Sequence, residues 1–466
     1  MNHKSFLRPE FRNTIPAVPG LFLLAVWIFL ITVDAAPAQQ SLQDMDFRKS
    51  LAGEVEQMLR VNLLESWYPV AIDHEYGGYI SRFDYRWQPE GNQTKMVVTQ
   101  ARHVWTTSTA SRFFDGDTTL LGYARHGYRF LRDVMRDKDY GGFYTMTTRE
   151  GQPITGPGGS LMKEAYGNAF VIYGLAAYYR SSGDDEALQL AKELFLWLDR
   201  HAYDPTNGGY FQYMQRDGQV VKTGPRNTPP KDQNSTIHIL EAFAELYRVW
   251  PDRMLRNRLE ELVMIIRDTI RAEPGYLNLF FTADWQPVSY RDSTSAVREA
   301  RFFFDHVSFG HDVETAWLLL DAEDALGSGY SPETLTAARQ MVDHSLLNGW
   351  DHEQGGFFDA GYYLKGDTTL TIIRDTKNWW AQAEGLNTLL VMEDIYPGDP
   401  MAYGERFLEI WAYINRYLID HEHGGWFEGG LDKQPEFIGG PKAHVWKGNY
   451  HNGRALMNVI RNLTQN

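Results

Sequence analysis

The 466-residue chain contains no cysteine. Disulfide bonds, thiol catalysis and cysteine-ligated metal sites are therefore excluded, while the redox compartment stays open. Positive charge is also scarce, since 45 Lys and Arg face 60 Asp and Glu and the net charge is −15. This balance argues against nucleic acid or an anionic membrane surface as a partner. A neutral or cationic small molecule remains compatible with it.

Several motifs of known chemistry are absent as well. The sequence has no His-Glu-x-x-His pair, no phosphate-binding glycine loop, no Rossmann fingerprint and no Gly-x-Ser-x-Gly elbow. His311 and Glu314 have the spacing of one metal-ligand pair, but no third ligand is evident. We therefore expect a site without a metal.

Long hydrophobic runs occur only at the amino terminus. Three basic residues precede an apolar run over residues 18–33, and small residues follow at Ala36 and Ala38. This order is typical of a secretory signal peptide, which we place at residues 1–38. The alternative is an uncleaved membrane anchor. We expect the mature protein, residues 39–466, to be exported to the periplasm or the medium, monomeric and not membrane-bound.

A glycine-glycine-aromatic pattern recurs through the rest of the chain. Its copies begin at Gly77, Gly141, Gly208, Gly355 and Gly424, and a degenerate copy contains Gly275. Successive copies lie roughly 64 to 80 residues apart, which marks an internal repeat. The sequence between copies is amphipathic with helical spacing, and each period has room for two helices.

Six periods of two helices predict about twelve helices in one all-α domain. No linker or charge block divides the array, and helical hairpins with apolar faces must bury them against one another. We therefore predict a single (α/α)6 barrel, with short Gly-Gly turn or strand segments at one mouth, although the length alone suggests two or three domains. Residues 281–301 are polar and irregular, and we expect them to form a loop over one mouth.

Unusual polar or aromatic residues follow the glycine pairs at a constant distance. The distance is 25 to 27 residues for five of them and 36 for His311, where the long loop accounts for the excess. Residues at the same position within each repeat should lie at the same level along the barrel axis. These side chains should therefore form one layer near the start of the inner helices. The members of this layer are Arg102, Tyr166, Asn234, His311, Trp380 and His451.

His311 lies in the stretch that the rest of the site depends on. We expect Gly310 to break the backbone, which places His311 in the first turn of a helix with Glu314 on the same face. A helix amino terminus disfavours imidazolium and a nearby carboxylate favours it, as suits a histidine that exchanges protons near neutral pH. The alternative is a histidine that caps a helix and pairs with a surface glutamate.

Five further positions could bind or polarise a substrate. Arg102 is a permanent cation that could stabilise a developing oxyanion, or an arginine whose stem covers apolar surface. Asn234 and His238, one turn apart on an apolar helix, suggest a pair facing the lumen. Tyr166 and Phe170 could stack on a sugar or belong to the core.

Two tryptophan-containing segments complete the candidate set. Trp380 and Glu384, one turn apart, provide an apolar face and an acceptor, which a sugar ring requires. Trp446 precedes His451, a second histidine suited to catalysis. His444 and His306 are weaker candidates that we interpret as structural.

Three histidines and one arginine favour proton transfer over glycoside cleavage, which needs two carboxyls across the scissile bond. A base acting beside a carbonyl needs a group that titrates near pH 7, a second acid or base, and a cation for the enediolate. His311, His451 and Arg102 match these three roles.

From about residue 63 to 463 the chain resembles the cellobiose 2-epimerases of the N-acylglucosamine 2-epimerase superfamily. The motifs that carry the resemblance are Gln100-Ala-Arg102-His-Val-Trp, Tyr166-Gly-Asn-Ala-Phe170, Asn234-Ser-Thr-Ile-His238, Gly310-His311-Asp-Val-Glu314-Thr-Ala-Trp317, Trp379-Trp380-Ala-Gln-Ala-Glu384 and Trp446-Lys-Gly-Asn-Tyr-His451. The resemblance implies the (α/α)6 barrel and epimerisation at C2 of a reducing-end aldose in a β-1,4-linked disaccharide, with no metal or nucleotide cofactor. An exported enzyme of this kind could meet mannobiose released from plant mannan.

The resemblance also implies a role for each matched residue. His311 and His451 resemble the general acid/base pair, His238 the group that assists ring opening, and Arg102 the group that stabilises the enediolate. Glu314 and Glu384 resemble orienting carboxylates. The residues that resemble the sugar-contacting set are Trp317, Trp380, Trp446, Tyr166, Phe170 and Asn234.

Other functions remain open on the same sequence. An aldose–ketose isomerase, or a 2-epimerase of monosaccharides or N-acylglucosamine, would share the barrel and the enediolate. A glycoside hydrolase or lyase would use Glu314 and Glu384 instead. A carbohydrate-binding protein without activity would keep the aromatic residues but would not need the histidines.

Overall fold

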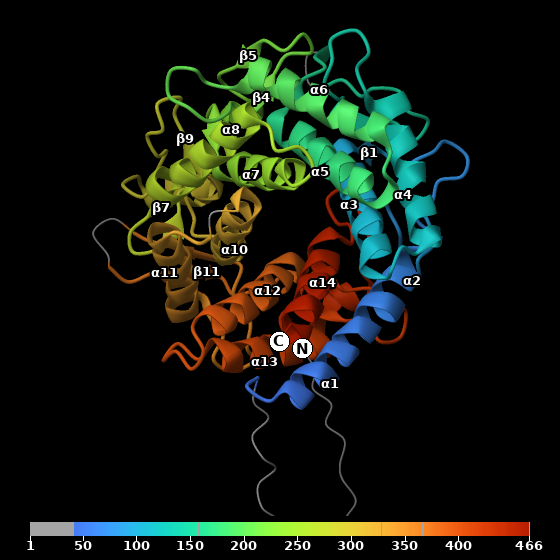
Figure 1. The fold of residues 1–466 in the computed structure, drawn as a ribbon. Coiled ribbons are helices and arrows are strands. Elements are labelled where there is room, and N and C mark those ends of the chain that lie inside the picture. Colours follow the sequence, from blue (N-terminus) through green and yellow to red (C-terminus); the bar gives the residue numbers. More distant parts are fainter. Residues whose placement is uncertain (1–41, 157–158, 328, 365–367, 466) are drawn as a thin grey trace, which may run out of the picture. The chain divides into compact units, whose positions relative to one another are not determined.

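A computed structural model of the chain describes residues 42–465, apart from 157–158, 328 and 365–367. The predicted signal peptide, residues 1–38, lies outside the described residues. Within them, six inner helices form a closed ring in which each helix packs against the next and the last packs against the first (Figure 1). The inner helices are α3 (Val97–Phe113), α5 (Ala165–Ser182), α7 (Gln233–Tyr247), α10 (Phe309–Leu326), α12 (Trp379–Ile395) and α14 (Tyr450–Thr464).

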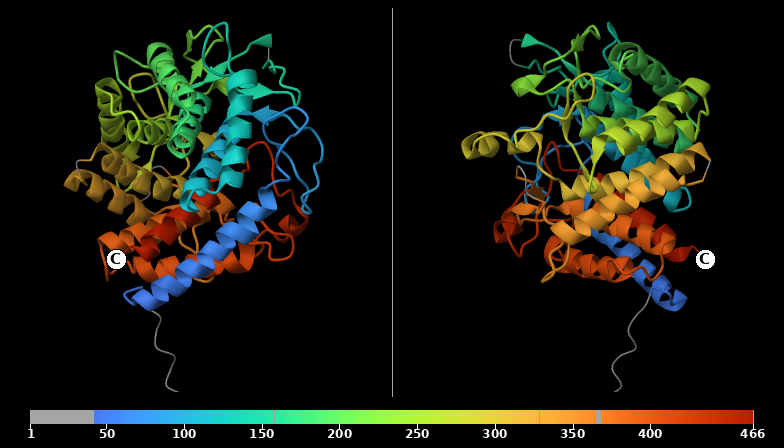
Figure 2. Two further views of the ribbon diagram at one scale, coloured as in Figure 1. Left: turned by 45° about the vertical axis from the view of Figure 1, so that its right-hand side comes forward. Right: turned by 90° about the vertical axis from the view of Figure 1, so that its left-hand side faces the viewer.

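Each inner helix is covered by one outer helix, as the side views also show (Figure 2). The outer helices are α1 (Met45–Gln57), α4 (Thr118–Phe130), α6 (Asp185–Ala202), α8 (Arg253–Ile265), α11 (Pro332–Gly349) and α13 (Tyr403–Tyr413). The described chain is thus an (α/α)6 barrel of six helix pairs, and the prediction from the repeat is confirmed.

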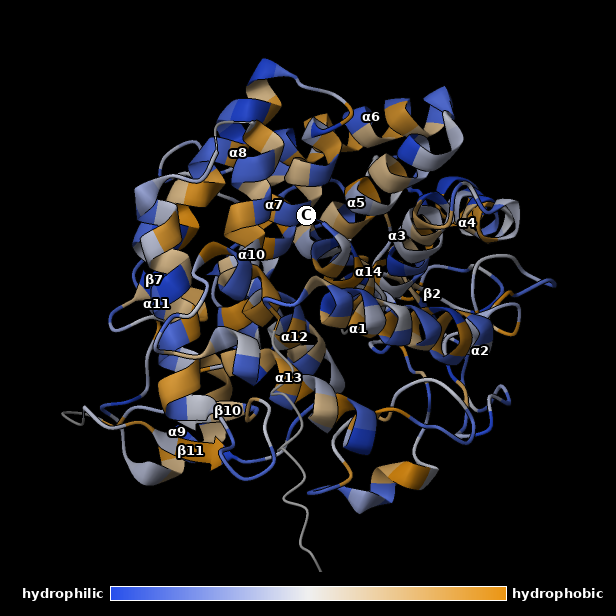
Figure 3. Cartoon of the chain, turned by 60° about the horizontal axis from the view of Figure 1, so that its bottom comes forward, coloured by the Kyte–Doolittle hydropathy of each residue, from blue (hydrophilic) through white to orange (hydrophobic). Residues whose placement is uncertain are grey.

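The two layers differ in residue pattern because their surroundings differ. In α5 every residue from Ala165 to Tyr178 is buried, since this inner helix is enclosed on all sides. Outer helices instead carry one apolar face and one polar face (Figure 3), as expected where one side meets solvent. Several outer helices begin with an aspartate at the N-cap, and the Asp117, Asp184 and Asp252 side chains each accept a bond from a backbone N–H of the first turn.

Short antiparallel strands surround the mouth at which the inner helices begin. The pairings are β1–β2, β3–β4–β5, β6–β9, β7–β8 and β10–β11. The strands are β1 (Lys95–Met96), β2 (Met146–Thr147), β3 (Lys163–Glu164), β4 (Tyr213–Met214), β5 (Val220–Val221), β6 (Lys231–Asp232), β7 (Arg271–Ala272), β8 (Tyr276–Leu277), β9 (Phe280–Phe281), β10 (Ala360–Tyr362) and β11 (Thr371–Arg374). Strands β1, β3 and β6 lead directly into inner helices and therefore fix where those helices start.

The remaining helical segments are short. Helix α2 (Glu65–Trp67) ends the first outer segment, and α9 (Ser295–Arg301) lies within the interval that we expected to be irregular. No helix in the described part of the chain has the length and apolar character needed to cross a bilayer.

Five of the glycine pairs are anchored by a buried lysine that the repeat pattern did not predict. In each, an aspartate four residues before the first glycine pairs with a lysine 22 to 27 residues later, at a nitrogen–oxygen distance of 2.5 to 2.9 Å. The pairs are Asp73–Lys95, Asp137–Lys163, Asp204–Lys231, Asp351–Lys377 and Asp420–Lys442. Removing one partner would leave the other charge buried, so these ion pairs hold the glycine turns against the inner helices.

Candidate active site

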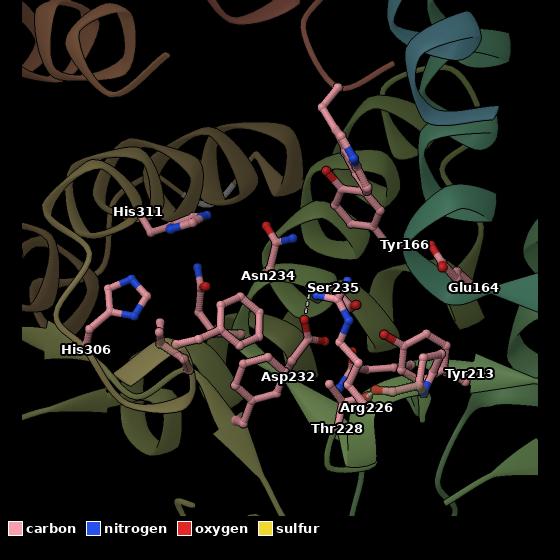
Figure 4. A pocket seen from close by; sticks show the side chains of 17 residues that line it. Glu164, Tyr166, Tyr213, Arg226, Thr228, Asp232, Asn234, Ser235, His306 and His311 are labelled. Carbon is pink, nitrogen blue, oxygen red and sulfur yellow. Dashed lines mark hydrogen bonds between the residues drawn. The ribbon is translucent and has the colours of Figure 1, made fainter. Parts of the chain in front are cut away.

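A cavity of about 620 Å³ opens at the mouth where the inner helices begin. Figure 4 shows His311 and His306 at one end of it, Tyr213 and Arg226 at the other, and Asn234 between them. The side chains come from the starts of α5, α7 and α10 and from the loops between helices. Its location at the barrel mouth is the one that the equal phase of the six residues predicted.

The structure places all six phase-matched residues within the first two turns of the inner helices. They come from six different helices: Arg102 from α3, Tyr166 from α5, Asn234 from α7, His311 from α10, Trp380 from α12 and His451 from α14. The predicted common layer is therefore present in the described barrel.

His451 is held by a buried carboxylate. Its Nδ1 lies 2.7 Å from Oε1 of Glu384, which also accepts a bond from Arg454 Nη2 at 2.6 Å. The second oxygen of Glu384 accepts from Trp317 Nε1 at 3.0 Å. Since an ionised carboxylate only accepts, His451 carries its proton on Nδ1 when neutral, and Nε2 remains free to accept another.

His238 is held in the same way by a residue that the sequence did not indicate. Its Nδ1 lies 2.8 Å from Oε2 of Glu241, and the other oxygen of Glu241 accepts bonds from Tyr450 and Arg454. Burial opposes the charge on Glu241, but Arg454 and His238 outweigh it and lower the pKa of the carboxyl to about 2. His238 thus also has a fixed Nδ1 and a free Nε2.

His311 has a hydroxyl partner instead of a carboxylate. Its Nδ1 lies 2.7 Å from Oγ of Ser308, the N-cap residue of α10. Because a hydroxyl can donate or accept, both neutral tautomers of His311 are satisfied, and its Nε2 can either give or take a proton. Glu314 lies on the same helix but does not pair with His311, as the alternative interpretation held, since it accepts from Arg454, 2.7 Å away.

Gly310 also differs from expectation. It lies inside α10, not at a break in the backbone. A Cβ atom there would lie 2.6 Å from Cβ of Ala381 and 2.8 Å from the Trp380 ring. Glycine is needed at this position so that α12 can approach α10 and place Trp380 beside His311, with 4.7 Å between ring centroids.

Burial is the main influence on the protonation of the histidines. It lowers the pKa of His311 to about 3, with further contributions from His238, His306 and His451. It also lowers the pKa of His451 far below its usual value, with Arg102 as the next cause. Both imidazoles are therefore neutral at pH 7 and can act as bases. The sequence interpretation considered the helix terminus and Glu314, and omitted the larger effect of desolvation.

Arg102 provides the positive charge near the histidines. It donates to the Tyr166 hydroxyl at 3.0 Å and lies over the rings of Phe170 and Tyr450, 4.3 and 4.8 Å from their centroids. Its buried Nε has no hydrogen-bond partner among the described residues. A guanidinium with spare donors in an aromatic enclosure is suited to stabilise an anionic oxygen.

Of the predicted sugar contacts, three line the cavity, one lies beside two of the histidines, and two are buried elsewhere. Tyr166, Asn234 and Trp446 line the cavity, and Trp446 is 52% exposed at its rim. Trp380 contacts both His311 and His451, with 5.7 Å between its ring centroid and that of His451.

Two predicted sugar contacts have other positions. Phe170 is buried beneath Arg102, and Trp317 is buried on the side of the barrel that faces away from the cavity. We therefore correct the placement of Trp317: its indole supports Glu384 and packs under the Arg454 guanidinium, 4.7 Å from the ring centroid. His306 and His444, interpreted as structural, bond Phe302 O and Glu428 respectively, although His306 also lines the cavity.

Glu314, Glu384 and His451 form one cluster of ligand-type atoms, all within 4.8 Å of one another. The same two glutamate oxygens are 2.7 and 2.6 Å from Arg454 Nη2. The guanidinium therefore supplies the positive charge that these carboxylates require, so this donor set fits an arginine-centred network and not a cation site.

Four site residues were missed by sequence reasoning: Glu241, Ser308, Tyr450 and Arg454. Glu241 lies three residues after His238, so helical spacing could have indicated that pair. Arg454 had no such signal, because its three carboxylate partners come from helices far apart in the sequence.

The far end of the cavity was missed too. There, burial raises the pKa of Asp232 to about 6, and burial together with Asp232 raises the pKa of Glu164 to about 7.

Comparison with known proteins gives consistent results. A model of the family described as N-acylglucosamine 2-epimerase (GlcNAc 2-epimerase) matches residues 78–452. The chain is similar to the cellobiose 2-epimerases of Ruminococcus albus, 30% identical over 425 residues, and Bacteroides fragilis, 29% identical over 423; each alignment covers 88% of this chain and 98% of the relative. It is also similar to the solved structure of cellobiose 2-epimerase from Spirochaeta thermophila, with 29% identity, a TM-score of 0.75, and coverage of 90% of this chain and 98% of that one.

Proposed function

The chain belongs to the N-acylglucosamine 2-epimerase family, and we propose that it interconverts reducing-end glucose and mannose in β-1,4-linked disaccharides. The observation that carries the proposal is the convergence of three histidines with separate partners on one barrel mouth, of which His238 and His451 are buried and His311 is half-buried. A sugar 2-epimerase must remove a hydrogen from carbon and return one to the other face, which requires bases held at fixed positions.

The first step in this proposal opens the sugar ring. His238, with Nδ1 fixed by Glu241, accepts the proton of the anomeric hydroxyl on Nε2 and returns it to the ring oxygen as the C1–O5 bond breaks. The Tyr166 and Phe170 rings lie beside it, with 5.3 and 4.9 Å between centroids, and limit the motion of the imidazole. Opening the ring exposes the C1 carbonyl, which acidifies the hydrogen on C2.

The second step transfers the C2 hydrogen between two imidazoles. His451 and His311 come from different helices, both contact Trp380, and both are neutral at pH 7. One neutral imidazole removes the C2 proton. The other takes a proton from the solvent and, as the imidazolium, delivers it to C2 from the opposite face and becomes neutral again. His311 can do either, because Ser308 satisfies both of its tautomers. In the reverse reaction the two histidines exchange roles.

Arg102 stabilises the enediolate that forms between these transfers. Its unpartnered Nε and aromatic surroundings give it a charge that is not neutralised by an adjacent carboxylate. Such a charge is strongest where water is excluded. The three glutamates Glu241, Glu314 and Glu384 are engaged with Arg454, so Arg102 remains available for the substrate.

The size of the cavity supports a disaccharide. At about 620 Å³ it lies in the middle of the range of sites for ligands of drug size, so it holds more than one sugar ring. We place the reacting sugar near His311 and the second sugar toward Tyr213 and Arg226 (Figure 4). The indole of Trp446, at the rim, offers an apolar face to one of them.

A hydrolytic reaction fits this arrangement less well. The two carboxylates that it would use, Glu314 and Glu384, both bond the same nitrogen of Arg454. Glycosidases instead hold two carboxyl groups on opposite sides of the scissile bond, with one protonated as an acid.

Proton NMR of cellobiose, mannobiose and mannose incubated with the protein in heavy water tests the proposal. We expect each disaccharide to give its 2-epimer with no release of monosaccharide, and mannose to react more slowly. Ketose in the product would indicate reprotonation at C1 and an isomerase, while free monosaccharide would indicate a hydrolase. Absence of any conversion of the disaccharides would exclude the proposed reaction.

A further inference from the structure

A second cavity, of about 280 Å³, lies at the opposite mouth of the barrel, where the inner helices end. We call it the far-mouth pocket. Arginine side chains from four inner helices line it: Arg112 (α3), Arg180 (α5), Arg248 (the C-cap of α7), and Arg454 and Arg461 (α14). Three acidic residues also line it. Arg454 is already paired with Glu241, Glu314 and Glu384, so the other four arginines face three carboxylates, and arginines remain in excess although the chain as a whole has a net charge of −15.

The acidic residues neutralise only one side of the far-mouth pocket. Arg180 pairs with Glu245 at 2.7 Å, and Arg248 pairs with Asp321 at 2.8 Å and with Asp324 at 3.2 Å. All three carboxylates belong to α7 and α10. The α3 and α14 side of the pocket therefore has positive charge without an adjacent carboxylate.

Arg112 and Arg461 are the residues on that side. Arg112 makes no side-chain hydrogen bond or ion pair with a described residue, and Arg461 makes one hydrogen bond, a 3.5 Å contact with Asn458. Arg112 is exposed at the pocket opening and Arg461 is half-buried. Partial desolvation, then repulsion by Arg180, lowers the pKa of Arg112; desolvation, then repulsion by Arg112, lowers that of Arg461. The guanidinium groups are thus close enough to repel one another.

A simpler explanation would be that these arginines cap the carboxyl ends of their helices. Cations are favourable there, and Arg248, at the C-cap of α7, donates to a backbone carbonyl of α10, that of Asp321, at 3.0 Å. Arg112 and Arg461 donate to no described carbonyl, so capping does not account for them. A buried donor on the pocket wall, Nε1 of Trp105, likewise has no partner among the described residues.

We propose that the far-mouth pocket binds a small oxyanion of the phosphate type, held by Arg112, Arg461 and Arg180. Each of two guanidinium groups with free N–H donors can form two parallel hydrogen bonds to two oxygens of a tetrahedral anion. Arg180 keeps its bond to Glu245 and adds charge at longer range. The anion is either free phosphate or the phosphate group of a larger metabolite, since both present the same oxygens. This site is separate from the catalytic cavity and does not depend on the proposed reaction.

Phosphate binding can be measured without turnover. Calorimetry and thermal unfolding of the full chain would be followed with sodium phosphate and with sodium chloride at equal ionic strength. We expect phosphate to raise Tm beyond the effect of chloride, and glucose 6-phosphate in a parallel titration to show whether a larger monoester also enters.

Variants then locate the site. Arg112→Ala and Arg461→Gln should each weaken phosphate binding about tenfold or more. Without phosphate, Arg112→Ala should have an unchanged or higher Tm, because it removes a repulsive charge and breaks no ion pair. The control is Arg200→Ala, which removes an exposed arginine near the end of outer helix α6 and should bind phosphate as the parent does.

Three results would overturn the proposal. One is an equal effect of phosphate and chloride on the parent. Another is unchanged phosphate affinity in both Arg112→Ala and Arg461→Gln. The third is a loss of phosphate affinity in Arg200→Ala as large as in the pocket variants.

Discussion

Replacing Glu384 by glutamine tests how the network controls catalysis. One oxygen of Glu384 accepts from Arg454 and from His451, at 2.6 and 2.7 Å, and the other accepts from Trp317 at 3.0 Å. A glutamine has only one carbonyl oxygen, so it can accept either from Arg454 and His451 or from Trp317. Its NH2 then faces a donor, either the indole of Trp317 or the guanidinium and the imidazole together.

The less costly orientation keeps the carbonyl on Arg454 and His451 and loses the bond to Trp317. Leaving a buried donor unpaired costs about 1–3 kcal/mol of unfolding free energy. The larger effect is on the reaction, because His451 loses its hydrogen-bonded carboxylate when it carries the C2 proton and keeps only the more distant Glu314, 3.7 Å from Nδ1. A neutral amide in place of the carboxylate behind a catalytic histidine lowers kcat by about 10²–10⁴.

Epimerisation of cellobiose followed by NMR would give kcat, and thermal unfolding would give the stability loss. Glu54→Gln is a matched control, because Glu54 accepts a 3.0 Å bond from the Trp411 indole on the outside of the barrel. Because Glu54 is exposed and a glutamine can keep its carbonyl on the indole, this variant should lose little stability and keep its activity. A folded Glu384→Gln variant with kcat within about threefold of the parent would refute the reasoning.

Three further predictions follow from single features of the barrel. Gly310→Ala should displace Trp380 and lower kcat/KM about tenfold or more, whereas Gly53→Ala in α1, where a Cβ meets nothing within 4 Å, should be neutral in the same kinetic assay. Lys231→Met should cost about 3–5 kcal/mol in denaturant unfolding, because it leaves its aspartate partner buried and unpaired. Burial lowers the pKa of His103 to about 3. Below pH 6.5, the usual pKa of histidine, the unfolded chain therefore binds a proton at this residue that the folded chain does not bind. The free energy of unfolding should be unaffected above that pH and should fall by about 2 kcal/mol at pH 5. His103→Gln should reduce this loss in unfolding curves measured between pH 7 and pH 5, and an unchanged slope would contradict the assignment.

The fold could be predicted from the sequence because each repeat of the sequence corresponds to one helix pair of the barrel. The glycine pairs recur once per helix pair, and the constant distance to Arg102 or Trp380 measures one strand and the first turns of an inner helix. This sequence separation is set by the lengths of the elements and not by side-chain contacts. It could therefore identify the residues at the barrel mouth. Lys231 and its counterparts also follow the aspartates at a nearly constant distance, a spacing from which the buried ion pairs could have been predicted but were not.

The contacts within the site could not be predicted in the same way. Helical spacing suggested that the Glu314 carboxylate lies close to the His311 imidazole and raises its pKa. Glu314 instead accepts a hydrogen bond from Arg454, 140 residues further along the chain. Which of several buried carboxylates a given arginine meets depends on how α10, α12 and α14 are rotated about their axes. One sequence contains no measure of that rotation. The sequence likewise gave no measure of desolvation, the largest cause of the lowered pKa of His311.

The central claim is that two imidazoles, His311 and His451, exchange the hydrogen on C2. The most direct measurement is the isotope at C2 of the epimer formed from cellobiose in heavy water, at low conversion, by the parent protein and by His311→Asn and His451→Asn. With two bases the delivered hydrogen comes from the solvent, so the parent should give product that is fully deuterated at C2, and each variant should form no epimer. Product that retains the original hydrogen, or a variant that epimerises at the parental rate, would contradict the account.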